Sequence, residues 1–148
     1  MVKVRNAEFT DFTNFNLHPN NLAEIKVSSG IDPDMCLAIL WEHSIEKLIA
    51  EVDGNPVCLY GIVQHEELNN FWLFFSKDIT NIPLSFFKES RKIAKNIINN
   101  YGYAEGWIYA KNTFAMQWAK WAGWTIDPGE PYGNAGEIFH KFYIGKVM

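Results

Sequence analysis

The sequence predicts an α/β protein, with one mixed β-sheet covered by helices. Two continuous apolar runs, Phe71–Phe75 and Trp107–Ala110, have the length of strands. They lack the alternation of a half-exposed strand, which indicates burial on both faces. Each run precedes a helical stretch, Leu84–Asn100 and Asn112–Ala122. The order strand, helix, strand, helix predicts a parallel crossover at the centre of the sheet.

The other elements are expected to be antiparallel strands and short helices around this unit. Asp53-Gly54 is a strong hairpin signal, because glycine adopts positive φ without strain, and it predicts an antiparallel meander. The polar stretches 64–70, 76–83 and 127–136 are expected to be a turn and two loops. Further strands are expected at 2–5, 45–52, 57–63, 124–126 and 138–144, the last antiparallel to 124–126. Further helices are expected after the caps Thr10, Asn20 or Asn21, and Asp32.

Composition limits the class of protein. A length of 148 residues predicts a single domain, 1–148, and 48% apolar residues exclude a disordered chain. A net charge of -4 argues against a nucleic-acid partner, which needs a basic face. We expect neither a secretory signal peptide nor a membrane span, and hence a cytoplasmic chain. Cys36 and Cys58 are predicted to be free thiols, and no metal-site spacing is present.

The stretch from Asn112 to Trp124 has the pattern Asn-x-x-Ala-x-x-Trp-x-Lys-x-x-Gly-Trp. Together with the order of elements, it resembles the GNAT (Gcn5-related N-acetyltransferase) fold around its fifth strand and fourth helix. The resemblance implies a V-shaped wedge between the fourth and fifth strands, where acetyl-CoA would bind. The residues that would contact the cofactor are then Phe74, Phe75, Lys77 and Asn112.

Within that fold, the chain more closely resembles the internal virion proteins of short-tailed bacteriophages, from Arg5-Asp11-Phe12 through Phe71-Trp72 to the final strand. This resemblance implies a virion or cytoplasmic location. It also implies other virion or host proteins as partners.

Two features depart from a working acetyltransferase. The family's glycine-rich pyrophosphate cradle is replaced by Lys77-Asp78-Ile79-Thr80-Asn81-Ile82-Pro83-Leu84, which has no glycine, contains an acid and includes a proline without an N–H. Where the family often has a tyrosine acid, this chain has Ala119. We therefore expect binding of acetyl-CoA to be weak or absent.

Candidates for acid–base chemistry remain. Glu66 and Glu67, with His65, stand just before the central strand and have the chemistry of a general base. The alternative is that they form a solvated hairpin turn. Tyr109 is the candidate to replace the missing acid, unless it is a core residue. His140 is more simply explained as a surface or hydrogen-bonded residue than as a catalytic one.

The tryptophans have two interpretations. Trp118 and Trp121 form one helical stripe, which is either core or an exposed interface for self-association or a partner.

The sequence supports two functions. In the first, the acetyl-CoA site is degenerate and no cofactor is expected, and the chain acts through protein contacts as a virion or assembly protein. In the alternative, it is an acetyl-CoA-dependent N-acetyltransferase.

Overall fold

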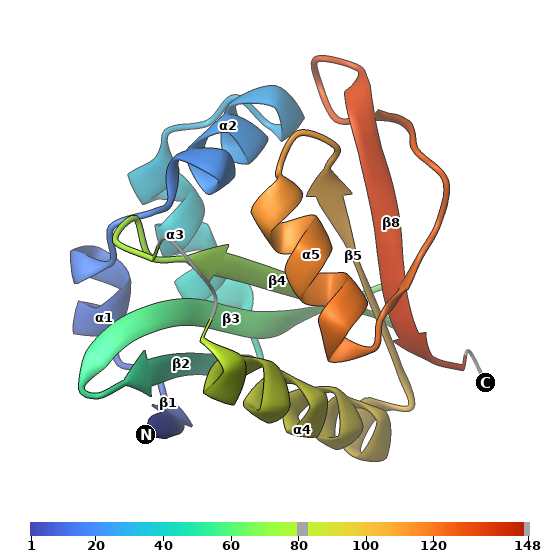
Figure 1. Cartoon of the computed structure of the whole chain (residues 1–148). Coiled ribbons are helices and arrows are strands. Elements are labelled where there is room, and N and C mark those ends of the chain that lie inside the picture. The colour runs from blue at the N-terminus through green and yellow to red at the C-terminus, as the bar shows by residue number, and fades with distance from the viewer. Residues whose placement is uncertain (80–82, 147–148) are drawn as a thin grey trace.

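The computed structural model describes residues 1–79 and 83–146. Its strands are β1 (Val2–Asn6), β2 (Glu46–Val52), β3 (Asn55–His65), β4 (Leu68–Phe75), β5 (Tyr103–Tyr109), β6 (Thr125–Ile126), β7 (Glu130–Tyr132) and β8 (Glu137–Gly145). Its helices are α1 (Phe9–Asn14), α2 (Pro19–Ser28), α3 (Pro33–His43), α4 (Leu84–Tyr101) and α5 (Thr113–Ala122). The described strands form one mixed sheet in the order β1-β2-β3-β4-β5-β8-β6, with β7 paired to β8 (Figure 1). The predicted α/β class is confirmed.

The centre of the sheet is a V-shaped wedge, as expected. Strands β1 to β4 are an antiparallel meander, and β4 then pairs with β5 in parallel only at Asn70 and Glu105. Beyond this pair, the two strands diverge towards their carboxyl ends. Gly106 lies at the vertex, where an added Cβ would stand 2.5 Å from the carbonyl oxygen of Phe71. Only a residue without a side chain lets the strands meet there.

Helices cover both faces of the sheet. In Figure 1, α4 and α5 lie on the viewer's side and α3 lies behind. One core includes Phe75, Phe86 and Trp118, and the other, against α1 to α3, includes Phe12 and Phe74. The predicted burial of the central strand is confirmed, since Phe71, Phe74 and Phe75 are buried and its other two residues half-buried.

Two predicted helix caps are wrong. Helix α1 begins at Phe9, before Thr10, and the Asp11 carboxylate accepts the Glu8 N–H at 2.8 Å. Helix α2 begins at Pro19, whose fixed φ suits the first helical position, and His18 caps it by accepting the Asn20 N–H. The predicted cap Asp32 of α3 is confirmed, and it accepts the Asp34 N–H at 2.9 Å.

Three predicted boundaries are also corrected. The turn at 64–70 is confined to Glu66-Glu67, because the polar residues beside it pair across β3 and β4, as Gln64 does with Asn69. Strand β5 begins at Tyr103, earlier than expected, and β7 lies within the expected loop 127–136. Antiparallel pairing with β8 stabilises both the start of β5 and β7. The predicted pairing of the last strand with 124–126 is confirmed.

Both cysteines are free, as predicted. Burial raises the pKa of the Cys36 thiol to about 11, and it also raises the pKa of the Cys58 thiol well above its ordinary value. In residues 1–79 and 83–146, no helix combines the length and apolar character needed to cross a membrane. The tryptophan stripe divides between the two interpretations. Trp118 is buried at 1% exposure, whereas Trp121 is 52% exposed.

Candidate functional site

The chain's own backbone pairs with the end of β4 that faces the wedge. The Phe75 carbonyl oxygen accepts the His18 N–H at 2.9 Å, and the Lys77 N–H donates to the Asn16 carbonyl oxygen at 2.8 Å. Leu17 and Ser76 form an antiparallel bridge between these two bonds. Residues 16–18 therefore extend the sheet as a short segment at the mouth of the wedge.

Asn21 of α2 binds the backbone N–H of Phe75 at the same edge of β4. Its side-chain oxygen accepts the Phe75 N–H at 2.9 Å, and its residue is 1% exposed. Because a backbone N–H can only donate, the oxygen of the amide must face Phe75. The amide nitrogen is then left to donate, and it donates to a Glu24 carboxylate oxygen at 3.2 Å.

Glu24 connects α2 to the other side of the wedge. Its second carboxylate oxygen accepts the Tyr109 N–H at 3.0 Å and the Asn112 side-chain N–H at 3.1 Å. Tyr109 ends β5, so Asn21 and Glu24 form a hydrogen-bonded bridge from the end of β4 to the end of β5. We call these two residues the wedge bridge.

The charge of the wedge bridge is finely balanced. All three side-chain or backbone partners of Glu24 donate, which suits an ionised carboxylate. Burial opposes ionisation and raises the pKa of Glu24 from 4.5 to about 7, while the hydrogen bonds from Tyr109, Asn112 and Asn21 lower it. Burial and hydrogen bonding therefore act on the pKa of Glu24 in opposite directions, and burial has the larger effect.

A cavity of about 330 Å³ adjoins the wedge bridge. It is lined by Glu24, by both strands of the wedge and by aromatic residues that include Trp72, Trp107 and Phe139. Leu73 contributes its backbone to this space. The N–H and C=O of Phe75 point away from β3. Along an antiparallel ladder every second residue points its N–H and C=O to the same side, so the N–H and C=O of Leu73 also face the wedge.

Aromatic rings pack around β4 on the other face of the sheet. Phe114 packs edge-on against Phe75 with ring centroids 4.9 Å apart, and His18 stacks on Phe114 at 5.3 Å. Trp118 stacks on Phe71 and donates its indole N–H to the Ser90 hydroxyl. Ala119, at the position of the family's acid, is fully buried.

Residues 76–79, directly after β4, use their backbone N–H groups within the chain. The Ser76 N–H donates to the Val57 carbonyl, the Asp78 N–H to the Ser76 hydroxyl and the Ile79 N–H to the Ser76 carbonyl. With Lys77 bound to Asn16, every backbone donor from 76 to 79 is used internally, and Ile79 is buried. Thr80, Asn81 and Ile82 lie outside the described residues. Pro83 caps α4 without an N–H to offer.

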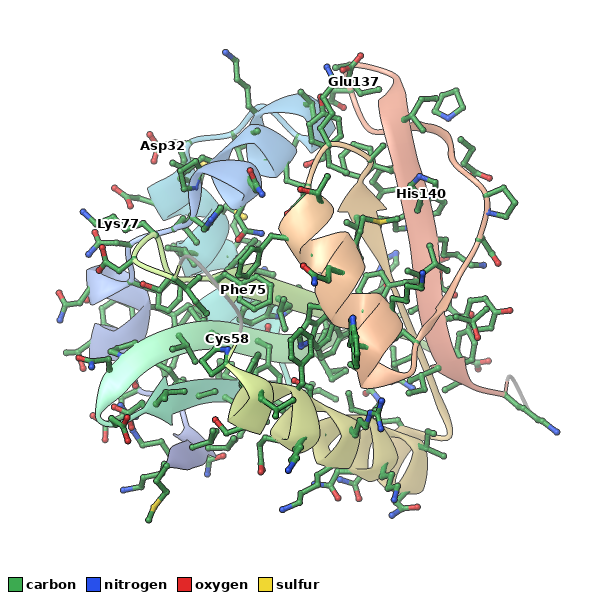
Figure 2. The ribbon with its side chains drawn as sticks, viewed as in Figure 1. Asp32, Cys58, Phe75, Lys77, Glu137 and His140 are labelled. Carbon is green, nitrogen blue, oxygen red and sulfur yellow. The ribbon has the colours of Figure 1, made fainter. Side chains whose placement is uncertain are left out.

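The four residues expected to contact a cofactor have other partners here. Phe75 lies in the interior beside α5, whereas Lys77 lies at the surface of the loop after β4 (Figure 2). Phe74 packs on the opposite face, in the core against α1 to α3. Asn112 is the cap of α5, with its side-chain oxygen on the Ala115 N–H at 3.1 Å.

The acid–base candidates are not brought together. Glu66 and Glu67 form the exposed turn that precedes β4, at the end of the strand opposite the mouth of the wedge. Tyr109 is buried, and its hydroxyl donates to Glu137 at 3.1 Å. His140 donates its Nδ1–H to the Asp127 carbonyl oxygen, 2.9 Å away. Their catalytic roles stay predictions.

Sequence reasoning missed the wedge bridge. It placed the start of α2 after Asn20 or Asn21, so neither Asn21 nor Glu24 was assigned to an inward face. Pro19 was the available signal. A helix that begins there places Asn21 and Ile25 one turn apart on one face, and both are buried.

Comparison with solved structures defines the fold. The spermidine N-acetyltransferase from Vibrio cholerae in complex with CoA and spermine aligns with a TM-score of 0.68 and 13% identity, covering 97% of this chain and 95% of that one. An N-acetyltransferase from Staphylococcus aureus Mu50 aligns at 0.64 with 14% identity, covering 98% and 97%. An acetyltransferase from Salmonella typhimurium with its cofactor acetyl-CoA aligns at 0.60 with 13% identity, covering 97% and 93%.

The protein therefore has the GNAT fold. Neither a protein-family model nor a curated protein matches the sequence. At 12 to 14% identity, this likeness shows the fold alone.

Proposed function

We propose that this chain is a GNAT-fold protein whose coenzyme A site is closed by its own residues, and that it acts through contacts with other proteins. The observation that supports this most directly is the wedge bridge. Asn21 and Glu24 hold the ends of β4 and β5 through groups that a ligand in the wedge would need. The partners we propose are virion or host proteins, a role suggested by the resemblance to phage internal proteins alone.

The second candidate is an acetyl-CoA-dependent N-acetyltransferase. The comparisons favour it over a virion role, since the structural neighbours are acetyltransferases and two of those described above carry CoA or acetyl-CoA. The cavity of about 330 Å³ beside Glu24 is a further observation in its favour. Against it stand the internal hydrogen bonds of residues 76–79, which leave the cradle without free donors in that segment.

Calorimetric titration with acetyl-CoA at low salt separates the two functions. We expect no heat of binding below millimolar concentration. Each loss of about 1.4 kcal/mol of binding free energy raises the Kd tenfold, so two or three lost phosphate contacts would shift a micromolar Kd towards millimolar. The Vibrio cholerae spermidine N-acetyltransferase is the positive control. Low-micromolar binding, or coenzyme A retained through purification, would contradict the proposal and make the transferase the leading function.

A further inference from the structure

We propose that the open groove between α4 and α5 is a docking site for an acidic, amphipathic helical segment of a partner protein. The groove has a volume of about 580 Å³ and is lined by Arg91, Met116, Gln117, Lys120, Trp121 and Ile126. Figure 1 shows both helices on the outer side of the same sheet face. This inference deepens the protein-contact function proposed above.

Trp121 is the anchor of the groove. It is 52% exposed, whereas Trp118, one turn earlier in α5, is buried. Its ring packs on Phe87 with centroids 5.6 Å apart, and its carbonyl oxygen accepts the Arg91 Nε–H at 3.1 Å. The Phe87 contact orients the ring and the Arg91 bond fixes the backbone that carries it. An exposed tryptophan with these supports has the properties of a binding hot spot, because less freedom is lost on binding.

An apolar stripe on α4 extends the groove. The apolar residues Leu84, Phe87 and Ile98 lie on one face of the helix, because they are three and eleven residues apart, and Arg91 lies among them on that face. Leu84 is 68% exposed and Ile98 is 40% exposed. A partner helix with apolar residues at the same spacing would cover this stripe and Trp121 together.

The charge around the groove determines the kind of partner. Arg91 and Lys120 line the groove, and α4 also carries Lys88, Lys92 and Lys95. Lys92 pairs with Glu89, the one acidic residue of the two helices, at 3.7 Å. Glu89 lies on the opposite flank of α4, where it lines a cavity with Tyr60. The chain as a whole has a net charge of -4, so this basic surface is a local exception and complements an acidic segment.

Other occupants fit less well. A single-stranded nucleic acid stacks its bases on successive aromatic rings, whereas Trp121 shares the groove with the aliphatic side chains of Met116 and Ile126. A second copy of the chain would bring a basic face against a basic face if the contact were symmetric. An acidic amphipathic segment satisfies both the apolar stripe and the charge.

The test uses labelled peptides of about 14 residues with leucines at helical spacing. One peptide carries glutamates at the remaining positions, one carries lysines, and one is a scramble of the acidic peptide. We expect the intact protein to bind the acidic peptide, measured by fluorescence anisotropy, at least tenfold more tightly than the other two. Trp121→Ala and Lys120→Glu should each weaken that binding about tenfold or more. Ile45→Ala and Lys3→Glu, exposed positions elsewhere, should change it less than twofold.

Four results would overturn the proposal: no binding of the acidic peptide at millimolar concentration, equal binding of the basic or scrambled peptide, tighter binding of a single-stranded oligonucleotide, or a dimer in sedimentation that Trp121→Ala dissolves. Circular dichroism of each variant separates lost binding from lost folding. The acetyl-CoA titration is independent of this surface. A protein that binds both the acidic peptide and acetyl-CoA keeps the docking site and contradicts only the closed wedge.

Discussion

The Glu24 carboxylate holds α2 to the end of β5 at a place where burial disfavours its charge. Its folded pKa of about 7 lies above the ordinary value of 4.5. Below pH 4.5, the group is protonated in both the folded and the unfolded chain, so burial of charge costs nothing. As the pH rises from 4.5 to about 7, the unfolded chain ionises first, and the free energy of unfolding falls by about 3 kcal/mol.

We predict that Glu24→Gln removes this loss of stability between pH 4.5 and 7. The glutamine has one acceptor oxygen where three donors converge, so the variant should also be about 1–3 kcal/mol less stable than the parent at low pH. Urea unfolding of both proteins at a series of pH values measures the two effects. Parallel pH profiles for parent and variant would show that Glu24 does not titrate near neutrality.

At the scale of the element, Asn112 performs two tasks at the start of α5. Its side-chain oxygen caps the helix through the Ala115 N–H, and its side-chain nitrogen donates to Glu24. The capping bond stabilises only the first turn of α5, whereas the second bond joins α5 to α2. The two tasks can be separated, because serine keeps a capping oxygen but is too short to replace the amide nitrogen.

We predict that Asn112→Ser costs about 1 kcal/mol of folding free energy and that Asn112→Ala costs about 2 kcal/mol or more. Thermal and urea unfolding provide the measurement. Asp32→Ala, which removes the exposed cap of α3 alone, is the matched control at about 1 kcal/mol. In the Glu24→Gln background, the cost of Asn112→Ser should shrink, and an unchanged cost would mean that the two side chains are not coupled.

At the scale of the whole molecule, the wedge depends on how closely β4 and β5 approach at their single paired position. Gly106 permits that approach, because a Cβ there would meet the Phe71 carbonyl oxygen at 2.5 Å and the Phe142 ring at 2.7 Å. A backbone oxygen cannot rotate away as a side chain can. Any larger residue must therefore move one half of the sheet relative to the other.

We predict that Gly106→Ala destabilises the fold by about 1–3 kcal/mol, the usual cost of overpacking. The parent and variant should also differ in hydrogen exchange at Asn70 and Glu105, whose pairing forms the vertex. Ile138→Ala, at an exposed position on β8, serves as the control and should lie within about 0.5 kcal/mol of the parent. A Gly106→Ala variant as stable as that control would show that the vertex is not tightly packed.

Local patterns in the sequence determined much of this architecture. Apolar runs, helical spacing and the Asp53-Gly54 turn predicted the order of the elements, since each signal lies within a few consecutive residues. The absence of glycine from the sequence Lys77 to Leu84 likewise indicated a poor phosphate site. The internal use of its described N–H groups is consistent with that prediction.

Only the tertiary structure decided which residues join the ends of β4 and β5 and which tryptophan is exposed. Asn21 meets Phe75 across 54 residues of sequence, and Glu24 meets Tyr109 across 85. Helical periodicity shows which residues share a face, but not which strand edge that face will meet. The same holds for Trp118 and Trp121, where the packing of α4 against α5 buries one ring and leaves the other at the surface.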